Sequence, residues 1–226
     1  MQLDAVGIVL AGGGSRRLAR LNLGPAGKAG LVVGGATCLE RVCRAVGSVV
    51  PRVLVVAAAG QPLPGLPAEV ETEFEIEIVR DASPAGGPLA GLRDGLRQAV
   101  GRQPPPRFAF VTSCDAPLLS ASVVQLLLKL ARSSAARVVV PLVDGHRQVL
   151  VSVLACDLLG SIEATVAVGG GVRALLDRLT ASDPAAVRLV AAKEIMAVDP
   201  DLGSFIDIDT PEDLAQLEIR GIPPSR

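Results

Sequence analysis

Short apolar runs alternate along the chain with longer stretches in which apolar residues recur every three or four positions. Most of the runs are nearly continuous, which is typical of strands buried on both faces of a sheet. The longer stretches have the spacing of helices with one apolar face. The predicted strands cover residues 4–10, 31–33, 53–58, 108–112, 137–142, 149–154 and 187–191, and the predicted helices cover 39–46, 88–100, 120–132, 172–179 and a segment from Pro211.

Residues 69–81 show a different pattern. Phe74, Ile76 and Ile78 alternate with glutamates, which predicts a half-exposed strand leading to Asp81. We interpret the charged strip Glu69 to Glu77 as the solvated face of an edge strand. The Pro- and Gly-rich residues 61–67 before it are expected to form a surface connection.

Regular alternation of strands and helices predicts an α/β protein with a three-layer α/β/α, Rossmann-like architecture and a mainly parallel sheet. Asp144-Gly145 is a typical tight hairpin turn, so an antiparallel insertion should make the sheet mixed. A chain of 226 residues suits one domain spanning residues 1–226.

Composition narrows the range of functions. The 22 basic and 23 acidic residues form no basic block, and there are four Phe but no Trp or Tyr, which argues against nucleic-acid binding. The four cysteines lack metal-ligand spacing. Without a secretory signal or a bilayer-length apolar run, a soluble cytoplasmic protein with no membrane partner is expected.

A glycine-rich loop follows the first predicted strand. Gly12, Gly13, Gly14 and Ser15 allow close approach of the backbone to a ligand, and successive N–H groups in such a turn can bind an anion. Arg16 and Arg17 follow directly, and Lys28 adds a further cation. The loop therefore predicts a phosphate-bearing ligand, although a ligand-free glycine turn is the simpler alternative.

Two common phosphate motifs do not match this loop. The dinucleotide pattern G-x-G-x-x-G would need glycine where Arg17 stands. The P-loop pattern would need a hydroxyl residue where Ala29 follows Gly27-Lys28.

Carboxylates follow several predicted strands. Asp81, Asp115 and Asp207 lie at or near strand ends, where ligands bind in open α/β sheets. Asp115 is the best candidate ligand for Mg²⁺, which prefers one or two carboxylates plus phosphate oxygens. Alternation within a short strand from Phe205 would place Asp207 and Asp209 on one side as further ligands, although Asp209 is also a candidate helix cap.

These motifs together carry a family resemblance. L-A-G-G-x-S-x-R at Leu10 to Arg17 resembles the signature loop of nucleotidyltransferases. Gly87-Pro88-Leu89-Ala90-Gly91 after Asp81, Ser113 to Pro117 and Ile208 to Leu214 resemble motifs of the molybdenum cofactor guanylyltransferases (MobA-like). The motifs run in order from residue 10 to 214 and cover nearly the whole chain.

The resemblance implies Mg²⁺-dependent transfer of a nucleoside monophosphate, GMP from GTP, to a molybdopterin-type phosphorylated acceptor with release of pyrophosphate. It places nucleotide and phosphates at Leu10, Ala11, Gly12 and Gly13, with Lys28 as the motif lysine. Asp81 and the turn Gly87, Pro88, Leu89, Ala90 and Gly91 would form the nucleoside pocket, and Asp115 would bind Mg²⁺. The residues that we consider catalytic are Arg16, Arg17, Lys28 and Asp115. The residues that we consider nucleotide-binding are Leu10, Ala11, Gly12, Gly13, Gly14, Ser15, Lys28, Asp81, Gly87 to Gly91 and Asp115.

Two alternatives accompany this prediction. One is a cytidylyl- or guanylyltransferase acting on another phosphorylated acceptor, because the ending Asp207 to Asp213 also suits related cytidylyltransferases. The other is a catalytically silent nucleotide-binding module. It is motivated by the segment Leu18 to Lys28, which departs from the family pattern R-M-G-x-x-K.

Overall fold

The computed structural model describes residues 4–12, 24–82, 86–210 and 212–215. Its main sheet has eight strands in the order β10-β7-β9-β6-β1-β4-β5, with β8 paired to β7. The strands are β1 (Ala5–Leu10), β4 (Arg52–Ala58), β5 (Glu75–Asp81), β6 (Phe108–Ser113), β7 (Val138–Val143), β8 (His146–Arg147), β9 (Val151–Ala155) and β10 (Val187–Ala191). A separate two-stranded hairpin joins β2 (Val32–Val33) and β3 (Ala36–Thr37).

The sheet is mixed and mainly parallel, as the sequence pattern predicts. Strand β1 is parallel to both β4 and β6, and β4 is parallel to β5. Strand β9 runs antiparallel to both β6 and β7, and β8 is antiparallel to β7. The positive φ angles of Asp144 (50°) and Gly145 (74°) make the tight turn between β7 and β8.

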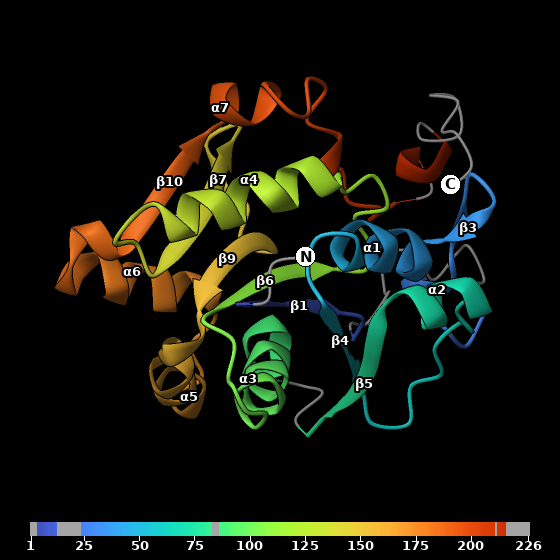
Figure 1. Cartoon of the computed structure of the whole chain (residues 1–226), viewed down its shortest axis with the longest axis horizontal. Helices are drawn as coiled ribbons and strands as arrows, with labels where there is room; N and C mark the ends of the chain where they lie inside the picture. Colours follow the sequence, from blue (N-terminus) through green and yellow to red (C-terminus); the bar gives the residue numbers. More distant parts are fainter. Residues whose placement is uncertain (1–3, 13–23, 83–85, 211, 216–226) are drawn as a thin grey trace.

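Helices cover both faces of the sheet, which confirms the predicted three-layer α/β/α class (Figure 1). Helices α1 and α4 pack on one face, and α3, α5 and α6 pack on the other. The helices are α1 (Cys38–Gly47), α2 (Ala68–Glu73), α3 (Gly87–Val100), α4 (Ala121–Arg132), α5 (Leu159–Ala167), α6 (Val172–Ser182) and α7 (Ala192–Met196). Short 3-10 helices include η2 (Gly27–Gly30), η3 (Cys156–Leu158), η4 (Pro184–Ala186) and η5 (Gly203–Phe205).

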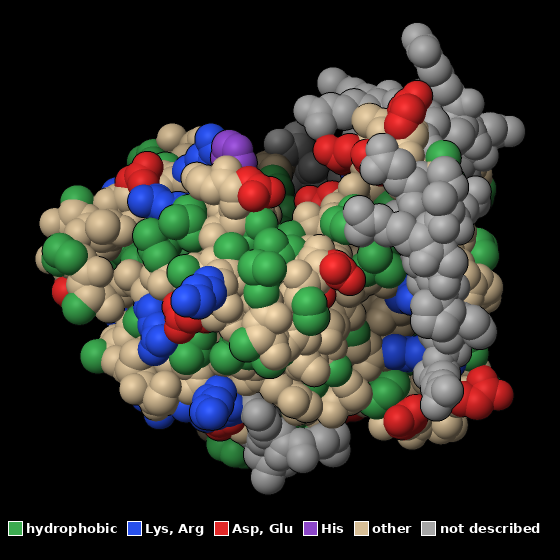
Figure 2. Space-filling view, turned by 90° about the horizontal axis from the view of Figure 1, so that it is seen from above, with side chains coloured by type: hydrophobic (Ala, Val, Ile, Leu, Met, Phe, Trp, Pro, Cys, Tyr) green, Lys and Arg blue, Asp and Glu red, His purple; other side chains and the backbone are tan. Residues whose placement is uncertain are grey.

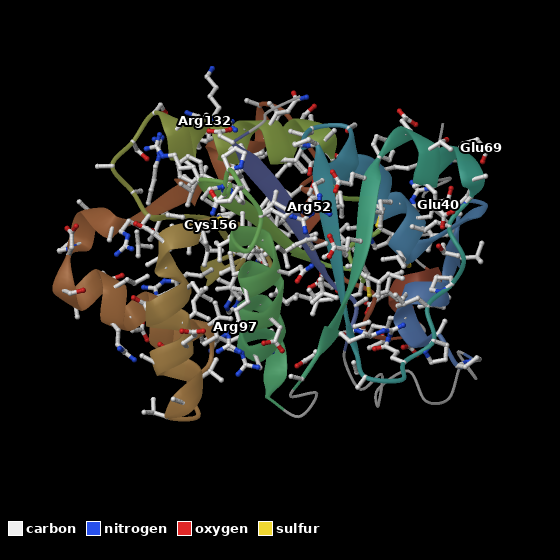
Figure 3. The ribbon with its side chains drawn as sticks, turned by 60° about the horizontal axis from the view of Figure 1, so that its bottom comes forward. Glu40, Arg52, Glu69, Arg97, Arg132 and Cys156 are labelled. Carbon is white, nitrogen blue, oxygen red and sulfur yellow. The ribbon has the colours of Figure 1, made fainter. Side chains whose placement is uncertain are left out.

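Ion pairs tie neighbouring elements together around this apolar core. Arg97 on α3 contacts Glu163 on α5 at 2.7 Å, and Arg52 on β4 contacts Glu77 on β5 at 2.6 Å (Figure 3). Arg132 at the end of α4 pairs with Asp4 ahead of β1. On the face shown in Figure 2, charges of both signs lie interspersed with hydrophobic side chains.

Three local predictions need correction. Residues 68–73 form helix α2, not the edge strand predicted from Glu69, because Pro67 starts a helix whose Val70 is buried. Strand β9 begins at Val151, since residues 148–150 form a turn closed by Val151 N–H donating to Gln148 O. Residues 206–209 form no strand, and η5 precedes them.

Helices in the C-terminal third of the chain also differ from those predicted. Helices α5 and α7 were not expected. Pro211, where the last helix was predicted to begin, lies outside the described residues, and residues 212–215 are helical. In the part of the chain that the structure describes, no single helix is long and apolar enough to span a membrane. The helical segments 156–167 and 172–182 reach that length and apolarity only when they are joined, and a bend of 119° separates them.

The packing of β1 against α1 depends on a glycine. A Cβ atom added at Gly7 would lie 2.3 Å from Val46 Cγ1. Gly7→Ala should therefore lower the free energy of unfolding by about 1–3 kcal/mol through overpacking. Gly160→Ala is the matched control, because Gly160 is an exposed residue of α5 with no atom within 4 Å of an added Cβ. This control should gain about 0.5–1 kcal/mol. Chemical denaturation measures both, and equal stabilities would contradict this packing.

Candidate functional site

A cleft of about 200 Å³ opens at the carboxyl edge of the parallel strands. The chain leads from β1 to β4 and β5 on one side and then crosses to β6 on the other side of β1. Leu10 and Ser113, the last residues of β1 and β6, are paired in register. The cleft therefore lies at the topological switch point, where open α/β sheets bind ligands.

Six residues predicted from the sequence line this cleft: Leu10, Ala11, Gly12, Lys28, Pro88 and Asp115. Five other residues line the cleft, namely Gly27, Gln61, Ser113, Cys114 and Leu150. None was assigned a site role from the sequence, although Ser113 and Cys114 belong to the motif that contains Asp115. Leu150 reaches the cleft because the reversed strand β9 begins at this edge of the sheet. Gly13, Gly14, Ser15, Arg16 and Arg17 lie outside the described residues.

The most polar part of the site is an ion cluster of three residues. Lys28 Nζ lies 2.8 Å from Asp115 Oδ2 and 2.5 Å from Asp209 Oδ1. The side chains of Lys28 and Asp115 are only 18% and 20% exposed, whereas Asp209 is 44% exposed. Two carboxylates thus converge on one cation at the rim of the cleft.

Backbone and side-chain contacts position each member of this cluster. Cys114 N–H donates to Leu10 O at 3.0 Å, and Ser113 Oγ donates to Asp115 Oδ1 at 2.5 Å. Ile208 N–H donates to Asp115 O at 3.0 Å, which brings the C-terminal segment to the loop after β6. Lys28 lies on η2, which packs against α1.

Hydrogen bonds around Thr210 show which residue caps the C-terminal helix. Thr210 Oγ1 accepts from Asp213 N–H at 3.2 Å, and Asp213 Oδ2 accepts from the N–H groups of Asp209 (3.0 Å) and Thr210 (2.7 Å). Thr210 is therefore the capping residue. The Asp209 carboxylate instead meets Lys28.

Electrostatics make this corner of the cleft anionic despite the lysine. Burial disfavours the charged form of Lys28, but hydrogen bonds to Asp115 and Asp209 outweigh it and raise the pKa of the ammonium. Burial and repulsion by Asp115 and Asp209 raise the pKa of Asp207 to about 7. The carboxyl groups therefore outnumber the cation, and a second positive charge would relieve their repulsion.

The described start of the glycine loop is tied to strand β4. The N–H groups of Ala11 and Gly12 both donate to Val56 O, at 2.8 and 3.2 Å. A Cβ atom on Gly12 would lie 3.4 Å from Ala58 N, so glycine lets the loop rest closely on the end of β4. Both amides are thus already used in bonds to the sheet. The N–H groups predicted to bind an anion would therefore belong to other residues of the loop.

The predicted nucleoside side lies where β5 meets α3. Asp81 ends β5 as a buried residue, and its Oδ2 would lie 3.8 Å from a Cβ atom on Gly91. Gly87 begins α3 with a positive φ of 72°, and Pro88 occupies the first turn. Leu89 and Ala90 are buried, and of this turn only Pro88 lines the cleft.

A buried ion pair that the sequence did not reveal lies where the end of β5 meets α3. Asp94 on α3 accepts from Ala82 N–H at 3.0 Å and from Arg93 Nε at 2.7 Å. Burial opposes ionisation of Asp94, but these hydrogen bonds lower its pKa. On the helical spacing Asp94 lies on the side of α3 opposite Leu92 and Leu96, so the apolar pattern of the helix gives no signal of its burial.

The donor chemistry fits a divalent cation held jointly with a ligand. Among residues 4–12, 24–82, 86–210 and 212–215, no group of three or more His, Cys, Asp or Glu could hold a metal. Asp115 and Asp209 do converge on one cation, the Lys28 ammonium. Two carboxylates completed by phosphate oxygens are a usual Mg²⁺ environment.

Comparison with known proteins gives the class of enzyme to which this fold and cleft belong. The family model described as "MobA-like NTP transferase domain" matches residues 7–185, and the chain belongs to this family. The protein is therefore a nucleotidyltransferase, which confirms the resemblance seen in the sequence.

Individual relatives agree with this assignment. The chain is 36% identical over 199 residues to a probable molybdenum cofactor guanylyltransferase of Mycobacterium avium, covering 88% of this chain and 92% of that protein. A protein of the same description from Mycolicibacterium paratuberculosis is 37% identical over 202 residues, with the same coverage. The structure also resembles molybdopterin-guanine dinucleotide biosynthesis protein A of Archaeoglobus fulgidus, with a TM-score of 0.73, 21% identity and coverage of 96% and 98%.

Cys114 lines the cleft, but its thiol is unsuited to act as a nucleophile. Burial raises the pKa of Cys38, Cys43 and Cys156 to about 12 and that of Cys114 well above its ordinary value. At neutral pH the four free thiols of the folded protein should therefore resist alkylation by iodoacetamide, whereas the unfolded chain should react at all four. Mass spectrometry counts the adducts. Rapid labelling of Cys114 alone in the folded protein would contradict this.

Proposed function

We propose that the protein transfers GMP from GTP to a molybdopterin-type acceptor phosphate and releases pyrophosphate. The observation that carries the proposal is the convergence of Asp115 and Asp209 on one cation beside the glycine loop. The names of relatives that cover most of this chain support guanylyl transfer to the molybdenum cofactor.

Asp115 and Asp209 would hold Mg²⁺, and the Asp207 carboxyl, whose pKa their charges raise, would be a further candidate ligand. When bound, Mg²⁺ would neutralise triphosphate charge and polarise the phosphoryl group under attack. Ser113 would hold the Asp115 carboxylate in place through its 2.5 Å hydrogen bond. This arrangement leaves the other Asp115 oxygen facing the cation position.

Lys28 would exchange one anionic partner for another. In the free protein it neutralises Asp115 and Asp209. Lys28 would turn to the triphosphate when these carboxylates hold a divalent cation. Arg16 and Arg17, which follow the loop in the sequence, are proposed to add positive charge there. An acceptor phosphate is already ionised at neutral pH, so attack needs positioning and charge neutralisation rather than a general base.

The guanine is proposed to lie beside Asp81. A carboxylate has about four acceptor sites, so Asp81 can accept two hydrogen bonds besides those it makes within the protein, and guanine presents two adjacent N–H donors on one edge. The turn from Gly87 to Gly91 would let the base approach α3, because Gly91 carries no side chain between Leu10 and Asp81. Cytosine presents only one amino donor on its pairing edge, so this pocket favours guanine.

Pyrophosphate release in the presence of molybdopterin, Mg²⁺ and either GTP, CTP or ATP tests this proposal. We expect turnover with GTP only. Asp115→Asn should reduce turnover by about 10²-fold or more, because metal binding loses a charged ligand, while thermal unfolding confirms that the variant is still folded. Preference for CTP would reject guanylyl transfer, and GTP binding without turnover would indicate a silent nucleotide-binding module. Near-normal activity of Asp115→Asn would reject its role.

The position of Lys28 makes a separate prediction about metal binding. Lys28→Met removes the ammonium that occupies the space between Asp115 and Asp209, so the nucleotide-free protein should bind Mn²⁺ roughly tenfold more tightly. GTP binding should weaken in the same variant, because the triphosphate loses a cationic partner. Mn²⁺ titration by electron paramagnetic resonance measures the first effect.

The matched control is Lys129→Met, which removes an exposed lysine of α4. It should bind Mn²⁺ and GTP as the wild type does. Weaker Mn²⁺ binding by Lys28→Met would show that the lysine supports the metal site instead of competing with the metal.

A further inference from the structure

Gln61 connects two strand ends at the edge of the cleft. It follows the turn that closes β4, in which Gly60 has a positive φ of 73° and Gln61 N–H donates to Ala58 O at 3.0 Å. Its side chain folds back over this turn. Gln61 Oε1 accepts from Ala58 N–H at 3.2 Å, and Gln61 Nε2 donates to Ala11 O at 2.9 Å.

With these contacts, every backbone hydrogen bond described for Ala11 and Gly12 runs to β4 or to the turn after it. The N–H groups of Ala11 and Gly12 donate to Val56 O, and Ala11 O accepts from Gln61. Three consecutive backbone groups are thus held by the end of one neighbouring strand. Of these three bonds, only the one to Ala11 O depends on a side chain and can be removed by substitution.

Packing shows that this arrangement is close. A Cβ atom on Gly12 would lie 3.4 Å from Ala58 N and 3.9 Å from Gln61 Oε1. The loop therefore lies directly against the turn and the carboxamide. A shift of the carboxamide would move the loop where it leaves the sheet.

Arg80 braces the same turn from its other side. Arg80 Nη1, at the end of β5, donates to Gln61 O at 2.7 Å and to Ala58 O at 3.3 Å. Arg80 thus holds the turn, whereas the Gln61 side chain holds both the turn and the glycine loop. This difference provides a matched pair of residues for a test.

We infer that Gln61 is a positioning residue that fixes the Ala11–Gly12 backbone as part of the wall of the cleft that binds the nucleotide. Its role for the nucleotide rests on the proposed function. Gln61 acts through the loop. The bond to Ala11 O is present in the free protein, so Ala11 and Gly12 are already held in place before the nucleotide binds. Substrate and transition state would contact the same fixed backbone, so loss of the bond should raise KM for the nucleotide and leave kcat nearly unchanged.

The test compares Gln61→Met, which keeps the side-chain length without its polar atoms, with Arg80→Met. Amide hydrogen exchange of Ala11 and Gly12 should be about tenfold faster in Gln61→Met and unchanged in Arg80→Met. Calorimetry with GTP and Mg²⁺ should show about tenfold weaker binding by Gln61→Met alone, and kinetics should show the same change in KM with kcat within about twofold. Thermal unfolding checks that both variants are folded.

Hydrogen exchange separates failure of this inference from failure of the proposed function. Unchanged exchange of Ala11 and Gly12 in Gln61→Met would overturn the positioning role even in a fully active enzyme. Equal effects of both variants would show that Gln61 only stabilises the turn and would also overturn it. If the wild type binds no GTP, the proposed function fails, while faster exchange in Gln61→Met alone would still support its hold on the loop.

Discussion

The contact of one lysine ammonium with two carboxylates is the interaction on which the site depends. Lys28, Asp115 and Asp209 come from segments separated by 87 and 181 residues. Two partly buried carboxylates repel each other unless a cation lies between them. The ion cluster therefore holds η2, the loop after β6 and the C-terminal segment together. It also keeps two oxygen ligands pointed at one position, which is the geometry that a divalent cation and a triphosphate would need.

Much of the fold could be predicted because buried strands have continuous apolar sequences. Strands β1, β4 and β6 are buried on both faces, so their continuous apolar runs were recognised, with boundaries correct to within one residue. Helix α2 was missed because its glutamates continue into the alternating pattern of β5, and only Val70 anchors it. Helix α7 has a single buried residue, Ile195, and a pattern of five residues carries too little periodicity.

The candidate site was predictable where its chemistry follows strand ends. Asp115 and Lys28 were proposed from the sequence, and the structure brings them to 2.8 Å. Asp209 was ambiguous because a cap and a ligand use the same residue type, and the Thr210–Asp213 hydrogen bonds identify the cap as Thr210. Gln61 could not be found, because its bond to Ala11 O spans 50 residues within an unremarkable Pro- and Gly-rich connection.

The most direct test of this account is a crystal structure with GTP and Mn²⁺, in which the anomalous signal of the metal marks its position. The account predicts Mn²⁺ bound by Asp115, Asp209 and triphosphate oxygens, with Lys28 moved from the carboxylates to the phosphates and guanine beside Asp81. A metal bound elsewhere, or a triphosphate outside the cleft with the Lys28 contacts to Asp115 and Asp209 intact, would contradict it.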